Sequence, residues 1–491
     1  MRRTTVTVLA VALIAGLVGV ALMPRAPRLG GQSTGDRDLA DVVRSATPDP
    51  SGLRGLAVAL VEIGRIRTAG LGDRDRTGRP VEPGTPFEIG SVTKAFTGML
   101  LADQVAAGVV GPDDRLGATW PEITGPARDA TLAELASHRA GLPRLAPGSP
   151  LGWARTLWSN VSGANPYAGQ DVDAVRGATD RVDPDDDERG EVHYSNLGPS
   201  VLGHALAARA GVAYPELLHD RLLRPLDMTA TTVATRVDDL PADRAHGGRA
   251  GGRPLDPWAG AGYAPAGAGP WSTAEDLGRL LTAILAGTAP GADATTARFR
   301  EDDDTRIGYG WFTTRHGDRE IVWHNGATGG FRSYVGLERA TGRAVVVLGN
   351  TDKGVEPIGL RLLGVPPKQA DSATSMVLPW IGAGLAVAFT FLGGLSLLGT
   401  ARRRQLDQVT LLAAAVWAFA YLGLGHRMGD WSMVPAWLWP LGAGLSAAAV
   451  ALAATRWRTL PVVDARVPWR RLLSVASSLG AAVLAVVAVV G

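Results

Sequence analysis

Apolar positions gather at the two ends of the chain, and a more polar stretch lies between them. An unbroken run of apolar and small residues from Val6 to Met23 follows Arg2 and Arg3, as in a signal peptide or a signal anchor. Four further runs are close to the about 17–25 residues that a membrane-spanning helix needs. They are Met376–Leu398, Val409–Leu424, Trp431–Ala454 and Leu472–Val490. The pattern therefore predicts four transmembrane helices at the C-terminal end.

The alternative for these four runs is a set of core helices in a soluble domain. Two observations favour the membrane. The runs carry almost no charge and show no amphipathic pattern. Half of the 14 tryptophans lie in or beside this region, several at the ends of runs, where an interfacial aromatic belt is expected.

The arginines predict how the chain crosses the membrane. Arg402–Arg404 follow the first C-terminal run, and five arginines lie between Arg456 and Arg471 after the third. The loop between the second and third runs, Gly425–Asp430, contains one arginine and one aspartate. The positive-inside rule places the two arginine-rich loops in the cytoplasm and the central region outside, which agrees with Arg2 and Arg3 remaining inside.

The central region predicts an α+β fold. Gly55–Glu62 and Arg65–Gly70 have the composition of a β-hairpin, and three more strand-like runs lie near the other end: Ile321–Asn325, Phe331–Leu337 and Arg343–Leu348. Between them the chain is mostly helical in pattern. Strands at both ends of the region predict one antiparallel sheet flanked by helices.

These patterns divide the chain into four parts. Residues 1–33 form the signal segment with its linker, residues 34–365 a folded domain, residues 366–375 a second linker, and residues 376–491 the four-helix transmembrane bundle. Whether the first segment is cleaved is left open, because Gly19-Val20-Ala21 resembles a cleavage site and the run is also long enough to span.

Composition excludes several classes of chemistry. The 491 residues include no cysteine, which rules out disulfides, a thiol nucleophile, cysteine-ligated metals and a lipidated cysteine. The net charge of +2 gives no basis for nucleic-acid binding. The eight histidines are scattered, so no histidine cluster suggests a metal site, and the resemblance described below implies that neither a metal nor a cofactor is required.

The strongest chemical signal is Ser91-Val92-Thr93-Lys94. The sequence pattern predicts a helix from this motif to about Ala107, and Gly108 is expected to end it. Ser91 and Lys94 then share one helical face, with the Ser91 hydroxyl at the N-terminal end where developing negative charge is favoured. A buried lysine with a lowered pKa can deprotonate a serine, whereas an arginine cannot.

Lysine usage sharpens this interpretation. The chain has 49 lysines and arginines, but its lysines are only Lys94, Lys353 and Lys368. A surface cation at position 94 would therefore be expected to be arginine. The alternative for the motif is a helix-capping serine beside a solvated lysine.

Two further segments carry candidate groups. In His193–Gly198, Tyr194 and Asn196 are two residues apart and can enter one pocket together, although an ordinary turn is the alternative. In Trp323–Gly330, His324 and Gly326 share a face of a strand, where a glycine would let substrate approach the backbone closely. The alternative for His324 is a hydrogen-bonded core histidine.

The order and spacing of Ser-x-x-Lys, Tyr-x-Asn and His-x-Gly resemble those of the serine hydrolases of the β-lactamase and penicillin-binding protein superfamily, in particular the class C and D,D-carboxypeptidase branch. The likeness covers roughly Leu39 to Leu363. Further matching segments are His138-Arg139-Ala140-Gly141-Leu142-Pro143, Arg224-Pro225-Leu226-Asp227-Met228, Ser272–Leu277 and Gly308-Tyr309-Gly310-Trp311.

The resemblance implies a β-lactamase/transpeptidase-like fold, with an antiparallel sheet flanked by helices and a helical subdomain. It implies catalytic roles for Ser91 as nucleophile, Lys94 as base and Tyr194 as proton donor to the leaving group. The backbone N–H groups of Ser91 and Ala327 would form the oxyanion hole.

Substrate binding is implied for Asn196, His324 and Gly326. The family's third motif usually begins with lysine in β-lactamases, and here His324 replaces it. An imidazole near its reference pKa of about 6.5 offers a full cation only at lower pH. We therefore expect neutral esters and amides to be preferred over carboxylate-bearing β-lactams at pH 7.5, with activity on carboxylates improving towards pH 6.

The sequence thus predicts a multi-pass cell-membrane protein with an extracytoplasmic serine hydrolase domain that cleaves an amide or ester. Its partners would be a small-molecule or peptide substrate, cell-wall-related or lipid-linked, and membrane lipids, but no nucleic acid. Alternatives are a true β-lactamase, or a penicillin-recognising or partner-binding module without turnover. Few charges lie within the runs, which argues against an ion-translocating bundle.

Overall fold

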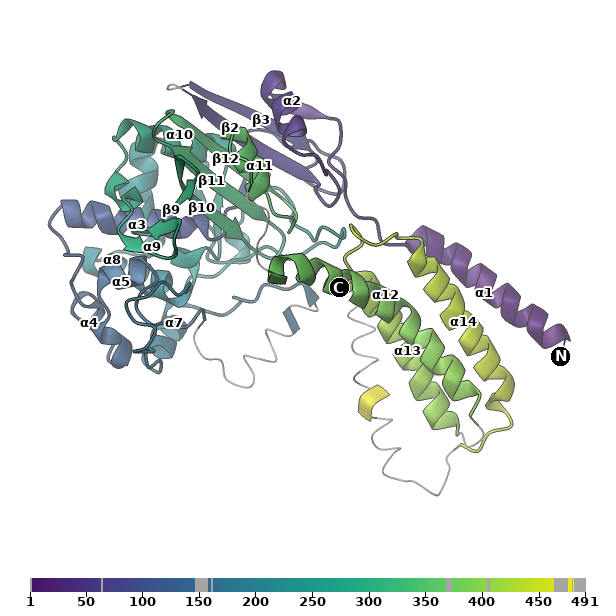
Figure 1. The fold of residues 1–491 in the computed structure, drawn as a ribbon. Helices are drawn as coiled ribbons and strands as arrows, with labels where there is room; N and C mark the ends of the chain where they lie inside the picture. Colours follow the sequence, from purple (N-terminus) through teal and green to yellow (C-terminus); the bar gives the residue numbers. More distant parts are fainter. Residues whose placement is uncertain are drawn as a thin grey trace.

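The computed structural model describes residues 2–62, 65–145, 158–159, 162–367, 373–403, 407–462, 476–478 and 480. Figure 1 shows two bodies: a mixed α/β body built on a twisted sheet, and an elongated helical bundle. The first helix of the chain lies in the bundle, so the polypeptide leaves the bundle, builds the α/β body and returns.

The main sheet joins the two ends of the central region. Its strand order is β1-β3-β2-β12-β11-β10-β9-β8-β7, and every neighbouring pair is antiparallel. The early strand β2 (Gly55–Glu62) pairs with the late strand β12 (Arg343–Gly349), with Val58 opposite Val347. The predicted single antiparallel sheet is therefore confirmed.

The five predicted strands are all present, within a few residues of the expected bounds. The structure adds short strands at the sheet edges and a separate three-stranded sheet of order β4-β6-β5, which the sequence pattern did not predict because two to five residues show no usable alternation. The strands other than β2 and β12 are β1 Ser33–Gly35, β3 Arg65–Gly72, β4 Phe87–Glu88, β5 Thr232–Val233, β6 Pro270–Ser272, β7 Phe299–Arg300, β8 Thr305–Ile307, β9 Phe312–His316, β10 Arg319–Ala327 and β11 Arg332–Glu338.

Helices cover both faces of the sheet. In β12, Val345 and Val347 pack in the core beneath α2 and α11, whereas Val346 and Leu348 pack in the larger core on the opposite face, with α3 and α10. Successive side chains of a strand point to opposite faces, so covering both faces requires an unbroken apolar run. The α-helices that the structure describes in this body are α2 Arg37–Ser45, α3 Val92–Ala106, α4 Leu116–Thr119, α5 Leu132–Ala136, α7 Val172–Thr179, α8 Leu197–Ala210, α9 Tyr214–Leu218, α10 Ala274–Ala286 and α11 Glu356–Leu362.

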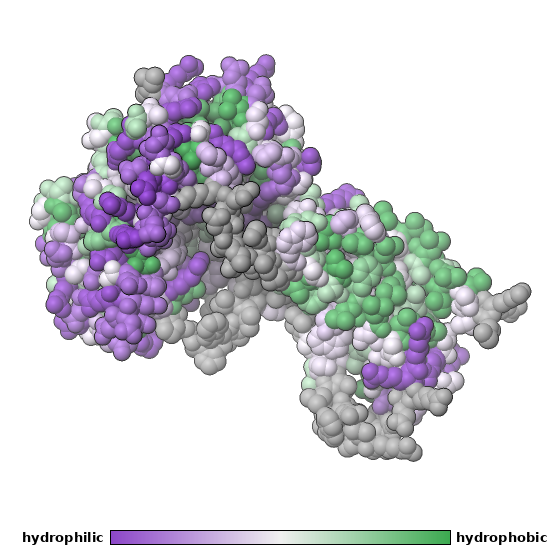
Figure 2. Space-filling model, viewed as in Figure 1, coloured by the Kyte–Doolittle hydropathy of each residue, from purple (hydrophilic) through white to green (hydrophobic). Residues whose placement is uncertain are grey.

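The bundle contains α1 (Arg2–Leu22), α12 (Ala373–Ala401), α13 (Gln408–Met428) and α14 (Leu438–Trp457). In the described part of the chain, these four helices are long and apolar enough to cross a membrane. Figure 2 shows that their visible outer surface is largely hydrophobic, in contrast to the polar surface of the α/β body. The predicted run Leu472–Val490 lies outside the described residues, apart from 476–478 and 480.

The start of α14 differs from the prediction. The apolar run begins at Trp431, but the helix begins seven residues later, at Leu438. The Trp431 indole N–H donates to the carbonyl of Gly425 (3.1 Å) near the end of α13, and Asp430 accepts from the backbone N–H of Ser432 (3.1 Å). These bonds hold a turn, and apolar composition alone cannot distinguish a buried turn from a helix.

The N-terminal helix packs against α14. A Cβ at Gly19 would lie 3.0 Å from Cα of Pro440, and one at Gly444 would lie 3.0 Å from the carbonyl oxygen of Ala12. The imidazole of His426, at the end of α13, lies 2.9 Å from the carbonyl oxygen of Leu22. Small residues thus let α1 approach α14 closely, and the end of α1 meets the end of α13.

Candidate active site

The turn before Ser91 is shaped by a glycine in the left-handed region. Gly90 has φ of +51°, and a Cβ there would lie 2.9 Å from the backbone nitrogen of Ala327. A larger residue would be both strained and blocked at this position. The turn therefore brings the start of α3 directly against the end of β10.

Ser91 occupies the N-cap position of α3 but does not cap it, because its side chain makes no capping hydrogen bond. The Ser91 residue is half-buried, and the alternative of a capping serine is wrong for this structure. Its hydroxyl oxygen lies 2.8 Å from Nζ of Lys94.

Lys94 is 1% exposed, so the alternative of a solvated lysine is also wrong. Its Nζ donates to the carbonyl oxygen of Ala266 at 2.7 Å. Burial lowers the pKa of the Lys94 amine, an effect that the neighbouring Tyr194 opposes and Arg144 reinforces. A buried amine with a lowered pKa beside a hydroxyl is the arrangement that can accept the hydroxyl proton.

Tyr194 lies on the other side of this amine. Nζ of Lys94 is 5.0 Å from the centroid of the Tyr194 ring, and the guanidinium carbon of Arg144 is 5.6 Å from it. The structure thus brings Ser91, Lys94 and Tyr194 together, although Tyr194 comes from a segment one hundred residues further along the chain.

A buried histidine that the sequence analysis did not single out supports Tyr194. The rings of His138 and Tyr194 stack with centroids 4.6 Å apart, and Nδ1 of His138 accepts from the backbone N–H of Ser195 at 3.3 Å. His138 has φ of +58°, which is uncommon for a residue other than glycine. The signal for it was the His138–Pro143 match, which we used only as a family motif.

Asn196 is the N-cap residue of α8, and its backbone N–H donates to the carbonyl oxygen of Arg144 at 2.9 Å. Tyr167 borders the same space: burial raises its pKa, Tyr263 and Tyr194 add to the increase, and Arg144 and Asn196 oppose it. Tyr194 and Asn196 therefore line one region together, with Tyr167 as an aromatic wall that the sequence analysis missed.

The two candidate oxyanion donors also meet. Ala327 is the last residue of β10 and is exposed. Because Gly90 has no side chain, the backbone nitrogen of Ala327 can approach the turn that leads into Ser91. Within the described residues, the backbone N–H of Ser91 has no backbone acceptor. The structure thus places the end of β10 beside the turn that leads into Ser91, and the oxyanion hole formed by these two N–H groups stays a prediction.

Gly326 is needed for a reason other than the predicted one. A Cβ at Gly326 would lie 2.0 Å from the carbonyl oxygen of Ile89, which also accepts from the Ser333 hydroxyl at 2.7 Å. The missing side chain makes room for the protein's own chain beneath the Ser91 turn. The role of Gly326 in substrate binding stays a prediction.

His324 is placed differently from the expectation. The residue is 0% exposed, and its Nδ1 lies 2.6 Å from the carbonyl oxygen of Asn325. Burial first, and then the nearby Lys94, lower the pKa of His324 to about 3. The imidazole is therefore neutral from pH 6 to 8, and the expectation that it gains charge towards pH 6 is wrong.

Glu88 is a second buried titratable group that the sequence analysis missed. Its Oε1 accepts from the backbone N–H of Trp258 at 2.8 Å, and the carboxyl group lies three residues before Ser91. Burial raises the pKa of Glu88 to about 8, although contacts with Thr328, Trp258 and Arg244 oppose the increase. The carboxyl group is therefore largely protonated near neutral pH.

Metal ligands do not gather in the part of the chain that the structure describes: no group of three or more histidine, aspartate or glutamate side chains is placed to hold an ion.

Comparison with known proteins places this site in a family. The beta-lactamase family model matches residues 43–362, well over half of the chain. The chain belongs to the beta-lactamase family. Members of this family are serine hydrolases, so the pairing of Ser91 with Lys94 lies in a fold that hosts serine hydrolysis.

Curated members of the beta-lactamase family show the same likeness over part of their length. The chain is 29% identical over 196 residues to the D-alanyl-D-alanine-carboxypeptidase/endopeptidase AmpH of Escherichia coli strain K12, covering 38% of this chain and 47% of AmpH. It is 27% identical over 353 residues to unguisins hydrolase ungD' of Aspergillus campestris, covering 64% and 62% of the two chains. The chain spans about half the length of the curated relatives it matches.

A solved structure agrees with the family's fold. The class C beta lactamase from Rhodobacter sphaeroides matches with a TM-score of 0.56 and 22% sequence identity, covering 67% of this chain and 99% of that chain. This likeness supports the β-lactamase/transpeptidase-like fold that the sequence predicted.

Replacing Lys94 with arginine tests the amine in this beta-lactamase-family site. We expect Lys94→Arg to reduce acylation of Ser91 by at least about 100-fold, because a guanidinium keeps its proton near neutral pH and general-base help is commonly worth about 10²–10⁴. The measurement is the labelling rate with a fluorophosphonate probe. Lys353→Arg, in a lysine paired with Asp49 on the surface, is the matched control and should label normally. Labelling of Lys94→Arg at the wild-type rate would exclude Lys94 as the base.

Glu88 predicts a pH dependence of stability. The unfolded chain ionises Glu88 above its ordinary pKa of about 4.3, whereas the folded protein keeps it protonated up to about pH 8. The folded state therefore binds more protons, and its stability falls as the pH rises from 5 towards 8. Glu88→Gln should remove this part of the fall. The melting temperature of the variant, measured relative to that of wild type, should therefore rise as the pH goes from 5 to 8. The exposed Glu320→Gln is the control, and equal slopes in all three proteins would contradict a raised pKa.

Proposed function

We propose that this protein is a membrane-anchored, extracytoplasmic serine hydrolase that cleaves an amide or ester through an acyl-enzyme on Ser91. The observation that carries the proposal is the buried Lys94 amine, whose Nζ lies 2.8 Å from Oγ of Ser91. A structural lysine gains nothing from such a position, because burial penalises its charge.

In the proposed reaction, the neutral amine of Lys94 takes the proton of Ser91 as Oγ forms a bond to the substrate carbonyl carbon. The carbonyl electrons move to the oxygen, which accepts hydrogen bonds from the N–H groups of Ser91 and Ala327. Such donors are commonly worth about 10²–10³ in rate each. As the carbonyl re-forms and the bond from carbon to the leaving group breaks, Tyr194 passes its proton to the leaving group and regains one from the Lys94 ammonium, and water then hydrolyses the ester on Ser91.

The substrate proposal follows from the charges around the site. His324 is neutral, so the third motif supplies no full cation to grip a substrate carboxylate. The cation beside Tyr194 is the exposed Arg144, at the mouth of the site. Two of the relatives are named as a peptidase and a beta-lactamase, so we propose amide substrates, peptides among them, as well as small neutral esters.

The membrane part of the proposal divides the chain at residues 34, 365 and 376 into signal segment, hydrolase domain, linker and bundle. Three features meet at one end of the bundle: the end of α1, the turn after α13 and the hydrolase domain. A Cβ at Gly251 of the hydrolase domain would lie 2.9 Å from the carbonyl oxygen of Gly429 in that turn. The arginine-bearing loop after α12 lies at the other end, where Arg456 donates to the carbonyl oxygen of Arg403. This arrangement supports the orientation that the arginines predict.

We also propose that the first helix is kept as an anchor. The alternative is a cleaved signal peptide, which would remove the surface of α1 that packs on Pro440 and Gly444 of α14.

A probe experiment tests the proposed chemistry. Membranes that contain the full-length protein are treated with a fluorescent fluorophosphonate and, separately, with a fluorescent penicillin. We expect the fluorophosphonate to label the wild type but not Ser91→Ala, and a neutral short-chain ester to be turned over repeatedly. Stoichiometric labelling without turnover of any ester or peptide would favour the binding-module alternative, and labelling of Ser91→Ala at the wild-type rate would exclude Ser91 as the nucleophile.

Introduced cysteines test the topology, because the natural chain has none. In intact cells, an impermeant maleimide should label Asp186→Cys, in the hydrolase domain, but not Arg402→Cys, in the loop after α12. Permeabilised cells, in which both sites become accessible, are the control. Labelling of Arg402→Cys but not of Asp186→Cys in intact cells would reverse the orientation.

A further inference from the structure

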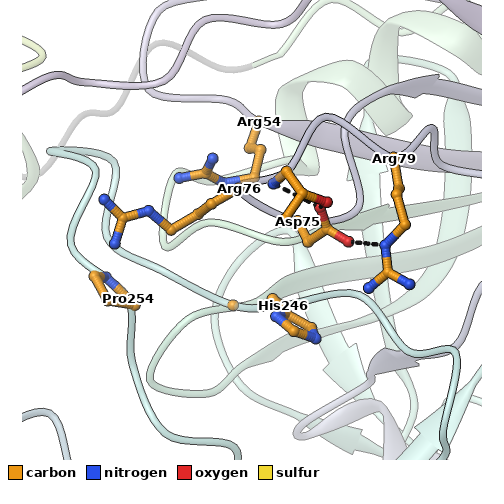
Figure 3. Close-up of a pocket in the computed structure, with 8 residues that line it drawn as sticks. Arg54, Asp75, Arg76, Arg79, His246 and Pro254 are labelled. Atoms are coloured by element: carbon orange, nitrogen blue, oxygen red, sulfur yellow. Dashed lines mark hydrogen bonds and ion pairs between the residues drawn. The ribbon is translucent and has the colours of Figure 1, made fainter.

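A cavity of about 130 Å³ lies outside the candidate active site, at the end of the main sheet where β2 begins and β3 ends (Figure 3). The loop that follows β3 forms one wall, and the segment from His246 to Pro254 forms another. The lining residues are Arg54, Asp75, Arg76, Thr77, Arg79, His246, Gly247 and Pro254.

The single carboxylate in this lining is already engaged. Arg79 donates to Asp75 at 2.5 Å, and the backbone N–H and the hydroxyl of Thr77 donate to it at 2.8 and 2.6 Å. Burial acts to raise the pKa of Asp75, but these bonds outweigh burial and lower it to about 2. Asp75 therefore pairs with Arg79 and, at 4.0 Å, with Arg74, and among the described residues it forms no ion pair with Arg54 or Arg76.

Arg54 and Arg76 are the unbalanced cations of the cavity. Among the described residues, neither guanidinium group has a hydrogen bond or an ion pair with a protein group. Figure 3 shows both groups pointing to the same side, away from the Asp75–Arg79 pair. Arg54 is half-buried, and its pKa is lowered by burial and then by the charge of Arg76, although the charges of Asp73 and Asp75 oppose the decrease. Arg76 is exposed, and its positive charge beside the half-buried Arg54 favours a bound anion between the two guanidinium groups.

A phosphate group fits this arrangement best. Guanidinium groups present forked N–H donors that match the oxygen pairs of phosphate, and one phosphate can accept from two arginines at once. The volume suits a headgroup phosphate but not a large organic molecule, because ligand pockets for drug-sized molecules are commonly about 300–1,000 Å³.

The position of the cavity points to the source of the phosphate. Gly52, two residues before Arg54, lies against the bundle: a Cβ there would be 3.5 Å from Cβ of Ser432, in the turn between α13 and α14. The opposite wall touches the bundle as well, since a Cβ at Gly252 would lie 2.1 Å from the carbonyl oxygen of Arg25, just after α1. The cavity is thus built at the end of the membrane helices, at the level where lipid headgroups would lie.

We propose that this cavity binds the phosphate of an anionic phospholipid headgroup between Arg54 and Arg76, which fixes the hydrolase domain against the membrane surface. The inference rests on the membrane placement in the proposed function. It goes beyond that function because nothing in the acyl-enzyme chemistry requires the site.

Binding at this site would also reach the candidate active site. The loop that walls the cavity packs on the turn after Ala327: a Cβ at Gly247 would lie 2.4 Å from the ring of Phe331 and 3.1 Å from the carbonyl oxygen of Gly330. Further along the same loop, Trp258 donates to Glu88. A headgroup that orders this loop therefore stabilises the turn that carries one of the two candidate oxyanion donors.

The test uses the full chain, purified in a non-ionic detergent, and follows its melting temperature as ligand is added. The probes are dihexanoyl phosphatidylglycerol, dihexanoyl phosphatidylcholine and inorganic phosphate, each below the concentration at which the lipid forms micelles. Ligands that bind the folded state raise the melting temperature by mass action. We expect phosphatidylglycerol to raise it, phosphatidylcholine to act more weakly because its choline is repelled by the arginines, and added salt to weaken the effect.

The variant pair Arg54→Gln with Arg76→Gln should weaken phosphatidylglycerol binding by at least about tenfold, the loss expected when a charge-assisted hydrogen bond to a ligand is removed. The control pair Arg65→Gln with Arg306→Gln removes the same charge at exposed positions away from the cavity and should bind as wild type does. The exposed single variant Arg76→Gln replaces the pair if the pair fails to fold.

Three results would overturn the proposal. One is equal phosphatidylglycerol binding by wild type and the cavity variants. Another is a melting temperature that no phosphate compound changes. The third is inorganic phosphate that binds as tightly as phosphatidylglycerol, which would identify a site for free phosphate instead of lipid. Fluorophosphonate labelling of the same proteins before lipid is added separates the two proposals, because the cavity variants should then label as wild type does and Ser91→Ala should bind lipid normally.

Discussion

The whole candidate site depends on keeping one lysine amine out of water. Lys94 is 1% exposed, and its Nζ touches Oγ of Ser91 on one side and the carbonyl oxygen of Ala266 on the other. Burying an ammonium without a carboxylate partner is unfavourable, so the environment favours the neutral amine that a serine hydrolase needs. The cost of this arrangement falls on folding stability, and the large core packed around α3 offsets it.

The surrounding structure can be understood as support for this amine and its serine. Gly90 and Gly326 let β10 and the turn before Ser91 approach closely, and Ser333 holds the carbonyl oxygen of Ile89 beneath that turn. His138 stacks on Tyr194 and accepts from the backbone beside it. His324 is buried and neutral near the amine, and burial is the largest influence on the pKa of Lys94 itself.

The sequence predicted what periodicity and local motifs encode. The central strands, α3 with its glycine stop and the helices α12, α13 and α14 follow from spacing and apolar pattern. The grouping of Tyr194 with Ser91 and Lys94 followed from the resemblance to the family. The sequence missed what depends on long-range contact. The carbonyl of Ala266 comes from a stretch that lacks polar or titratable side chains, so no motif marks it. The neutral state of His324 follows from burial, and the sequence of one strand does not show how deeply a residue is buried. The predicted run began at Trp431 because tryptophan is apolar wherever it lies. In the structure this residue belongs to a turn, and its indole N–H donates to the carbonyl oxygen of Gly425 near the end of α13.

The central claim is that Lys94 acts as a neutral base because it is buried. The most direct measurement is the second-order rate of fluorophosphonate labelling of Ser91 between pH 5 and pH 10, with an arginine at position 94 as the reference for probe reactivity. A lowered amine pKa predicts a rate that rises with pH and levels off well below about 10.4, the ordinary lysine value. A rate that still rises tenfold per pH unit at pH 9.5 would show that the amine titrates like a solvated lysine, and it would contradict the account.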